Sequence, residues 1–200
     1  VDIGGGTTDI AIYNNGSIEH TSSVSLGGDQ VTNDLAQALK TSTNNAEELK
    51  IRYGCVTSAF ENDDDIEVPG VGDRPARLVR KKIIIQVMSD RYQEIFSFVK
   101  EKIQQSGFED RIPAGIVLTG GSSKTEGIED SAEEVFHSQV RVGIPEHIYG
   151  GSEDIIKNPE YAACVGLLIY AKEKVSTKFV QSDNDFQSSI KKFLKKIFYD

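Results

Sequence analysis

The octapeptide Asp2-Ile3-Gly4-Gly5-Gly6-Thr7-Thr8-Asp9 stands near the start of the chain and joins two short apolar segments. Its three consecutive glycines allow the backbone to turn amide hydrogens toward an anion without obstruction by side chains. Thr7 and Thr8 offer hydroxyl donors, and Asp2 is suited to a metal-bound water beside phosphates. The octapeptide therefore predicts a phosphate-binding turn, and its simpler alternative is a tight glycine hairpin.

The segments around this turn carry the signals of an antiparallel meander. Strands are expected at 1–3, 10–13 and 18–25, and Asn14-Asn15-Gly16 is a strong hairpin signal between the last two. A dinucleotide-binding fingerprint requires a helix directly after the glycines, whereas another strand follows here. The pattern therefore excludes that fingerprint.

The rest of the chain alternates between helical and strand patterns, which indicates an α/β protein. After Gly27-Gly28, Asp29 is placed to cap a helix. The apolar run 116–119 ends in Gly120-Gly121, which predicts a strand, a glycine turn and then a helix. Helices are expected from 29 onward and at 45–53, 81–105, 126–137 and 159–171, with short strands within 56–79 and at 140–142.

Composition excludes several classes of protein. A hydrophobic fraction of 38% and a charged fraction of 26% describe a globular chain, and its net charge of −9 argues against a nucleic-acid partner. Cys55 and Cys164 are too far apart in sequence, and too few, for a disulfide framework or a zinc motif. No apolar run is long enough to cross a bilayer.

Three segments together resemble the actin, Hsp70 and sugar-kinase superfamily. The octapeptide resembles its second phosphate motif, 46–54 resembles the helix that supplies adenosine contacts, and 116–123 resembles the adenosine motif. The resemblance implies that ATP and Mg²⁺ bind here, with Asp2 holding the metal through water. A solvated helical ion pair remains the alternative for Glu47 and Lys50, and a plain strand-to-helix turn remains the alternative for Gly120-Gly121.

The resemblance also implies a set of nucleotide contacts and assigns no catalytic residue. Glu47 and Lys50 would contact adenosine, while the glycines of the adenosine motif would let the base and ribose approach the backbone. The implied nucleotide-binding residues are Asp2, Gly4, Gly5, Gly6, Thr7, Thr8, Glu47, Lys50, Gly120, Gly121, Ser122, Ser123 and Lys124.

Within that superfamily, the chain resembles the FtsA family of bacterial cell-division proteins. Arg52-Tyr53-Gly54-Cys55, followed by 66–72 and Arg74-Pro75, carries this resemblance, which extends over essentially all 200 residues. It implies an actin-like, ribonuclease H-like ATPase fold, of which this chain would be the second lobe, the C-terminal half. The sequence starts at Val1 within a strand pattern, so we expect it to be a piece of a longer protein.

The FtsA resemblance implies a division into subdomains. Residues 1–26 and 108–172 would form the nucleotide-binding subdomain 2A, and 27–107 an inserted α/β subdomain 2B that binds FtsZ. A flexible linker is expected at 173–185 because this segment is polar and weakly periodic. Residues 186–200 would form a membrane-targeting helix.

The C-terminal segment 186–200 has an amphipathic pattern typical of a helix that lies on a membrane surface. Its apolar side chains fall on one helical face and its lysines on the other, which favours anionic lipid. The alternative is a helix that docks on the core of the domain. The residues concerned are Phe186, Ile190, Lys191, Lys192, Phe193, Leu194, Lys195, Lys196, Ile197 and Phe198.

The same resemblance implies partners and a location. The protein would tether FtsZ filaments at the cytoplasmic face of the inner membrane, at the division site, and would self-associate into actin-like filaments and contact other divisome proteins during septum formation. Arg74, Arg77, Lys82 and Arg91 are expected to receive the FtsZ C-terminal peptide; a solvated basic face is the alternative.

ATP hydrolysis would be weak and regulatory in the full-length protein, and this half alone is expected to be inactive. Two other functions remain open from sequence. One is a pilus-assembly adaptor of the same fold, and the other is a kinase or chaperone that turns over ATP as its main task.

Overall fold

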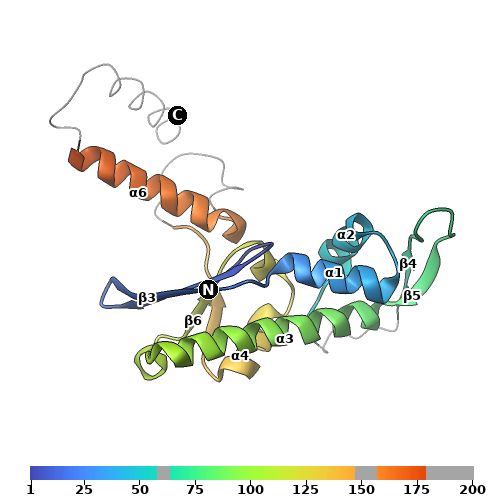
Figure 1. Ribbon diagram of the computed structural model, residues 1–200, viewed down its shortest axis with the longest axis horizontal. Coiled ribbons are helices and arrows are strands. Elements are labelled where there is room, and N and C mark those ends of the chain that lie inside the picture. The colour runs from blue at the N-terminus through green and yellow to red at the C-terminus, as the bar shows by residue number, and fades with distance from the viewer. Residues whose placement is uncertain (58–63, 147–156, 179–200) are drawn as a thin grey trace, which may run out of the picture. The chain divides into compact units, whose positions relative to one another are not determined.

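The computed structural model describes residues 1–57, 64–146 and 157–178, and it divides the chain into two compact units, Val1–Val142 and Gly143–Asp200 (Figure 1). The first unit contains all three segments of the expected nucleotide site. Its elements are built around a mixed sheet and the long helix α3 (Lys81–Ser106).

An antiparallel meander opens the first unit, which confirms the sequence-based expectation. Strands β1 (Asp2–Ile3), β2 (Thr8–Asn14) and β3 (Ser17–Val24) lie in that order in one sheet. Asn15 and Gly16 form the β2–β3 turn with φ values of 50° and 81°. Positive φ at both central positions is the geometry that matches the twist of the flanking strands, and Asn-Gly adopts it readily.

Strand β1 also joins a parallel pair from the other end of the unit. Strands β6 (Ile116–Leu118) and β7 (Val140–Val142) pair in parallel, and Thr119, directly after β6, bridges in parallel to Asp2. The amide of Ile3 donates to the Thr119 carbonyl, and the Thr119 amide donates to the Val1 carbonyl, both at 2.8 Å. The glycine turn after β1 and the glycine turn after β6 therefore leave the same edge of the sheet.

In its described residues, the insertion between β3 and β6 contributes three α-helices, a 3₁₀ turn, η2 (Glu109–Arg111), and a small sheet. Helices α1 (Gly28–Leu39) and α2 (Thr43–Tyr53) precede an antiparallel pair, β4 (Asp65–Val68) and β5 (Arg77–Arg80). Strand β5 leads directly into α3, which packs against α1, α4 (Ile128–Phe136) and the meander (Figure 1).

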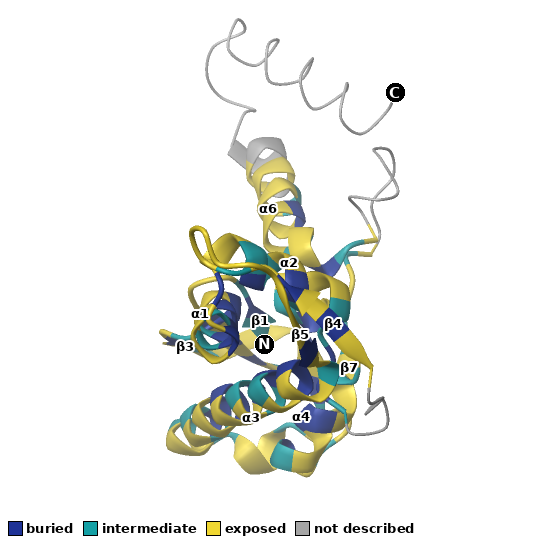
Figure 2. Cartoon of the chain, turned by 90° about the vertical axis from the view of Figure 1, so that its right-hand side faces the viewer, coloured by how far each residue is buried: buried dark blue, intermediate teal, exposed yellow. Residues whose placement is uncertain are grey.

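Helix α3 carries the largest buried side chains of the core. Figure 2 shows buried and exposed residues alternating along α3, as a one-sided apolar stripe requires. The rings of Tyr92 and Phe96 stack at 6.2 Å, and Phe96 meets Phe136 of α4 at 5.5 Å. The buried residues of α3 are Ile84, Ile85, Met88, Tyr92, Ile95, Phe96, Val99 and Ile103.

Helices α1 and α4 begin differently from the sequence-based expectation. Asp29 lies inside the first turn of α1, and the N-cap is Gly27, which makes no side-chain cap bond. The helix expected at 126–137 is preceded by a 3₁₀ turn, η3 (Gly121–Lys124), and begins only at Ile128. Gly127 has φ 78°, a left-handed conformation that an α-helix does not continue through.

The second unit contains one short 3₁₀ turn and one helix within its described part. In η4 (Pro159–Tyr161), the Asn158 side chain accepts from the Glu160 amide at 3.1 Å. Helix α6 (Ala162–Lys178) continues past 171, so the expected linker does not begin at 173. The remainder of that linker and the amphipathic segment 186–200 lie outside the described residues. Among the helices that the structure describes, none is long and apolar enough to span a membrane.

Replacing Phe96 by alanine is expected to lower the free energy of unfolding by about 3–5 kcal/mol, because truncation leaves a cavity in a fully buried site. Phe98 on the same helix is 40% exposed and serves as the control, and Phe98→Ala is expected to cost only about 0.5 kcal/mol. Urea unfolding followed by circular dichroism measures both. Equal losses in the two variants would contradict the placement of α3.

Candidate functional site

The glycine turn after β1 is joined to the N-terminus of α1 by two backbone hydrogen bonds. The Gly28 amide donates to the Gly4 carbonyl at 2.9 Å, and the Asp29 amide donates to the Gly5 carbonyl at 2.8 Å. These bonds satisfy two of the amides that any helix leaves unpaired at its N-terminus. The turn and the helix therefore form one rigid junction.

This junction fixes the direction of the amide hydrogens in the glycine turn. In a planar trans peptide, the carbonyl and the following N–H point in opposite directions. Because the carbonyls of Gly4 and Gly5 point at α1, the amides of Gly5 and Gly6 point away from it. Gly5, Gly6 and Thr7 are exposed, so these amides are presented to solvent as an anion cradle.

Gly27 and Gly28 make the close approach possible. A Cβ atom on Gly27 would lie 2.5 Å from the Gly5 carbonyl oxygen, and one on Gly28 would lie 2.8 Å from Ser122 Oγ and 3.4 Å from Lys50 Nζ. Sequence reasoning used this pair only as a helix boundary and missed its part in the site. The signal was a double glycine directly after the meander.

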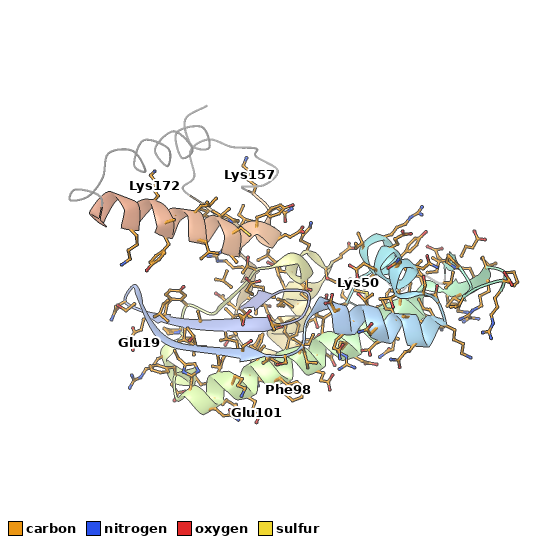
Figure 3. All side chains as sticks on the ribbon, turned by 45° about the horizontal axis from the view of Figure 1, so that its top comes forward. Glu19, Lys50, Phe98, Glu101, Lys157 and Lys172 are labelled. Atoms are coloured by element: carbon orange, nitrogen blue, oxygen red, sulfur yellow. The ribbon has the colours of Figure 1, made fainter. Side chains whose placement is uncertain are left out.

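Glu47 and Lys50 of α2 form an ion pair that is hydrogen-bonded to this junction. Lys50 Nζ lies 2.7 Å from Glu47 Oε2, 2.9 Å from Thr32 Oγ1 and 3.2 Å from the Gly28 carbonyl oxygen. Figure 3 labels Lys50 where α1 and α2 meet. An ammonium group has three donors, and all three have partners here. Lys50 therefore holds the network together, while the Glu47 side chain remains 42% exposed.

The charge of Glu47 is favoured at neutral pH. Burial raises the pKa of this carboxyl, but hydrogen bonds from Lys50 and Thr32 and the charge of Lys50 lower it more, so its pKa lies below its ordinary value. An ionised, partly exposed carboxylate is a suitable acceptor for sugar hydroxyls. The structure thus places an ionised Glu47 beside Lys50, which itself donates to the Gly28 carbonyl.

The glycine turn after β6 directly contacts the glycine turn after β1. Gly120 has φ 87°, and a Cβ there would lie 2.3 Å from Asp2 Oδ1 and 2.6 Å from the Ile3 carbonyl oxygen. Only glycine fits both the left-handed backbone and the space. In η3, Gly121 and Lys124 are exposed, and Ser122 is half-buried beside Gly28.

Two expected ligand contacts have structural roles instead. Thr8 is fully buried, because β2 alternates inward and outward from that residue, and its hydroxyl donates to the Leu26 carbonyl at 2.8 Å. Ser123 is 2% exposed and donates to the Gly120 carbonyl at 2.7 Å. Both hydroxyl protons are therefore engaged inside the protein and are not available to donate to a ligand.

Asp2 and Asp9 face each other as register partners of β1 and β2. Burial raises the pKa of Asp2, the Val1 amino group lowers it, and Asp9 raises it again, with a net rise. The Thr7 hydroxyl donates to Asp9 Oδ2 at 3.1 Å. A half-buried carboxylate with a second one nearby, beside an anion cradle, fits Mg²⁺, which binds proteins through one or two carboxylates, water and substrate phosphates.

The four expected peptide-binding cations lie in different environments. Arg77 Nη2 donates to the carbonyl of Leu39, the last residue of α1, at 2.6 Å. Arg91 pairs with Asp34 and Glu94, and the hydrogen bond with Asp34 is the main cause of its raised pKa. Arg74 and Lys82 are exposed.

Arg91 also lines an open groove of about 560 Å³. The groove lies between α1 and α3, and three of its lining side chains are acidic. The other lining residues are Asp34, Gln37, Ala38, Val87, Asp90 and Glu94.

Solved structures with the same fold are actin-like. MreB 5 of Spiroplasma citri bound to AMPPNP matches 98% of this chain and 54% of that chain, with a TM-score of 0.68 and 20% identity. The MamK double helical filament matches 86% of this chain and 53% of that chain, with a TM-score of 0.62 and 18% identity. The chain therefore has the fold of an actin-like ATPase.

Sequence comparison then identifies the family. The family model described as "Cell division protein FtsA" matches residues 1–166. Relatives of that name are 51% identical over 177 residues in Pseudomonas aeruginosa, 45% over 186 in Neisseria meningitidis and 38% over 205 in Escherichia coli. The chain belongs to the FtsA family. These matches cover 88%, 92% and 98% of this chain but 42%, 44% and 49% of the relatives, so the chain spans about half of their length.

Replacing Gly27 by alanine is expected to break the junction between the glycine turn and α1, because the new Cβ would overlap the carbonyls of Gly4 and Gly5. The expected loss is about 1–3 kcal/mol in the free energy of unfolding. Gly6→Ala is the matched control, since nothing lies within 4 Å of a Cβ there. Thermal unfolding compares the two variants, and similar melting temperatures would refute the junction.

Proposed function

We propose that this chain supplies the second-lobe half of an ATP and Mg²⁺ site in a cell-division protein that tethers FtsZ filaments to the inner membrane. The observation that supports the nucleotide site is the convergence of three motifs at Gly28. The glycine turn, the Glu47–Lys50 pair and Ser122 all lie within contact distance of that residue or of a Cβ built on it.

Each group at this junction has a distinct task in the proposed site. The outward amides of Gly5 and Gly6 receive phosphate oxygens, and Asp2 holds Mg²⁺ through water. Glu47 accepts from ribose hydroxyls, and Gly120-Gly121 with Ser122 receive the base. Bound Mg²⁺ would neutralise phosphate charge. The structures of MreB 5 bound to ADP or AMPPNP support a nucleotide in this fold.

Hydrolysis is proposed to be weak and to serve regulation. In the relatives, about half of the protein lies outside the part that this chain matches. That half would supply the other phosphate loop and the group that orients the attacking water, so this chain alone would not turn over ATP.

The nucleotide site is tested by calorimetric titration of MgATP into a protein of full family length that carries this chain. Glu47→Ala is expected to weaken binding at least about tenfold, because a charge-assisted hydrogen bond is lost. Glu48→Ala, one position along α2 and exposed, is the control and should bind as the unaltered protein does. Failure of the unaltered protein to bind MgATP would refute the site.

The insertion is proposed to bind the FtsZ C-terminal peptide around the start of α3. Exposed Arg74 and Lys82 would meet acidic side chains of the peptide directly. Arg91 is already paired with Asp34 and Glu94, so a peptide carboxylate would have to compete for it or join the network. Arg77 caps α1 and would act mainly through the fold.

The segment 186–200 is proposed to hold the protein at the cytoplasmic face of the membrane by its apolar face and its lysines. Self-association into actin-like filaments is proposed as well, supported by the filament that MamK forms with the same fold. Location at the division site and contact with other divisome proteins follow from the family. Together these properties make a peripheral tether.

Co-sedimentation of a labelled FtsZ C-terminal peptide with anionic vesicles tests both surfaces in the full-length protein. Deleting 186–200 is expected to leave protein and peptide in the supernatant. Lys82→Glu combined with Arg91→Gln is expected to leave the protein on the vesicles and to release the peptide. Lys102→Glu is a charge-reversal control on the same helix, about 30 Å along α3 from Lys82 at 1.5 Å per residue. Unchanged sedimentation of protein and peptide in these variants would refute the placement.

A role as a pilus-assembly adaptor has less support. The PilM–PilN complex matches 84% of this chain with a TM-score of 0.60, but at 16% identity that similarity shows only the fold. The family match favours cell division. No described feature favours a kinase or chaperone.

A further inference from the structure

Thr32 of α1 is a buried polar residue that contacts both members of the Glu47–Lys50 pair. Its side chain is 3% exposed, and its hydroxyl donates to Glu47 Oε2, 15 positions along the chain. Lys50 Nζ donates to the same hydroxyl oxygen at 2.9 Å. Thr32 lies outside the motifs that predicted a nucleotide site, so this contact adds a residue of α1 to that site.

The Thr32 hydroxyl has one proton and two acceptors within reach. One acceptor is the Gly28 carbonyl, four positions earlier in the same helix, at 3.0 Å, and the other is Glu47 Oε2. A charged acceptor forms the stronger hydrogen bond. The Gly28 carbonyl also has a second donor, because Lys50 Nζ lies 3.2 Å from it. The hydroxyl proton is therefore directed to the carboxylate, while the hydroxyl oxygen accepts from Lys50.

These contacts engage one oxygen of the Glu47 carboxylate. Thr32 Oγ1 and Lys50 Nζ both reach Oε2, Lys50 at a distance of 2.7 Å. An ionised carboxylate has two acceptor oxygens, and the Glu47 side chain is 42% exposed. The hydrogen bonds found among the described residues thus leave the second oxygen, Oε1, as the acceptor for a ligand.

Thr32 is held in place by its backbone and by burial. It lies one turn after Gly28, and the amides of Gly28 and Asp29 are hydrogen-bonded to the glycine turn after β1. A branched side chain within a helix has few allowed χ1 rotamers, and this one is almost fully buried. The Thr32 hydroxyl is therefore a fixed donor that relates the Glu47 carboxylate to the glycine turn.

We propose that Thr32 is a positioning residue for ribose recognition: its hydroxyl fixes the Glu47 carboxylate through Oε2 and leaves Oε1 to accept from the ribose hydroxyls. The inference rests on the proposed nucleotide site and names the group that orients its ribose contact. A threonine that only bonds to the carbonyl four residues earlier would affect stability but would not discriminate between nucleotides.

Thr32→Val tests the role because it removes the hydroxyl and keeps the branched shape. In a protein of full family length that carries this chain, calorimetric titration measures the Kd for MgATP and for the magnesium complex of dideoxy-ATP, which lacks both ribose hydroxyls. Thr32→Val is expected to raise the Kd for MgATP about three- to tenfold, the value of one hydrogen bond, and to leave that for dideoxy-ATP unchanged. Thr32→Ser keeps the hydroxyl and is expected to retain the preference of the unaltered protein for MgATP.

The Glu47→Ala background separates positioning from general damage. If Thr32 acts through Glu47, adding Thr32→Val to Glu47→Ala causes no further loss of MgATP affinity. If Thr32→Val does not fold, Thr32→Ala removes the same hydroxyl with less bulk and is expected to show the same selective loss.

Three results would each overturn the role: equal losses for both nucleotides, additive losses in the double variant, or an unchanged preference for MgATP without the hydroxyl. If the unaltered protein binds both nucleotides with the same Kd, the ribose contact and this inference fail while the nucleotide site stands. If it binds neither nucleotide, the proposed site fails as well.

Discussion

Two hydrogen bonds between a glycine turn and a helix end organise the whole site. Because the carbonyls of Gly4 and Gly5 accept from the first amides of α1, the N–H bonds of the same two peptide groups, those of Gly5 and Gly6, point away from the helix. The same junction brings Gly28 against Lys50 and Ser122, which leaves no room for side chains at 27 and 28. The two glycine turns and the Glu47–Lys50 pair are therefore brought together by one backbone arrangement.

Much of the fold could be predicted from local patterns. The meander followed from alternation and from Asn15-Gly16, and α3 followed from its apolar periodicity, because both signals depend only on residues near in sequence. The errors arose where a distant group decides the outcome. Helix α1 is capped by carbonyls of the glycine turn, which removed the need for Asp29 as a cap. Polar composition beyond residue 171 suggested a linker, yet α6 continues to Lys178.

In the candidate site, too, local motifs could be predicted from the sequence, whereas contacts with distant groups could not. Motif spacing placed Glu47, Lys50 and the two glycine turns in one site, and the structure brings them together. Spacing alone did not show that the Thr8 hydroxyl donates to the Leu26 carbonyl and the Ser123 hydroxyl to the Gly120 carbonyl. Burial and hydrogen bonding are tertiary properties, and a motif records only which residue types are present.

The bridge between β1 and the end of β6 has a consequence for biosynthesis. Asp2 bridges to Thr119, 117 positions later, so the two glycine turns meet only through a long-range contact. Such contacts form slowly because a large loop must close first. During translation the turn after β1 has no partner strand on that side until β6 has emerged. We therefore expect the candidate site to be among the last parts of this unit to form.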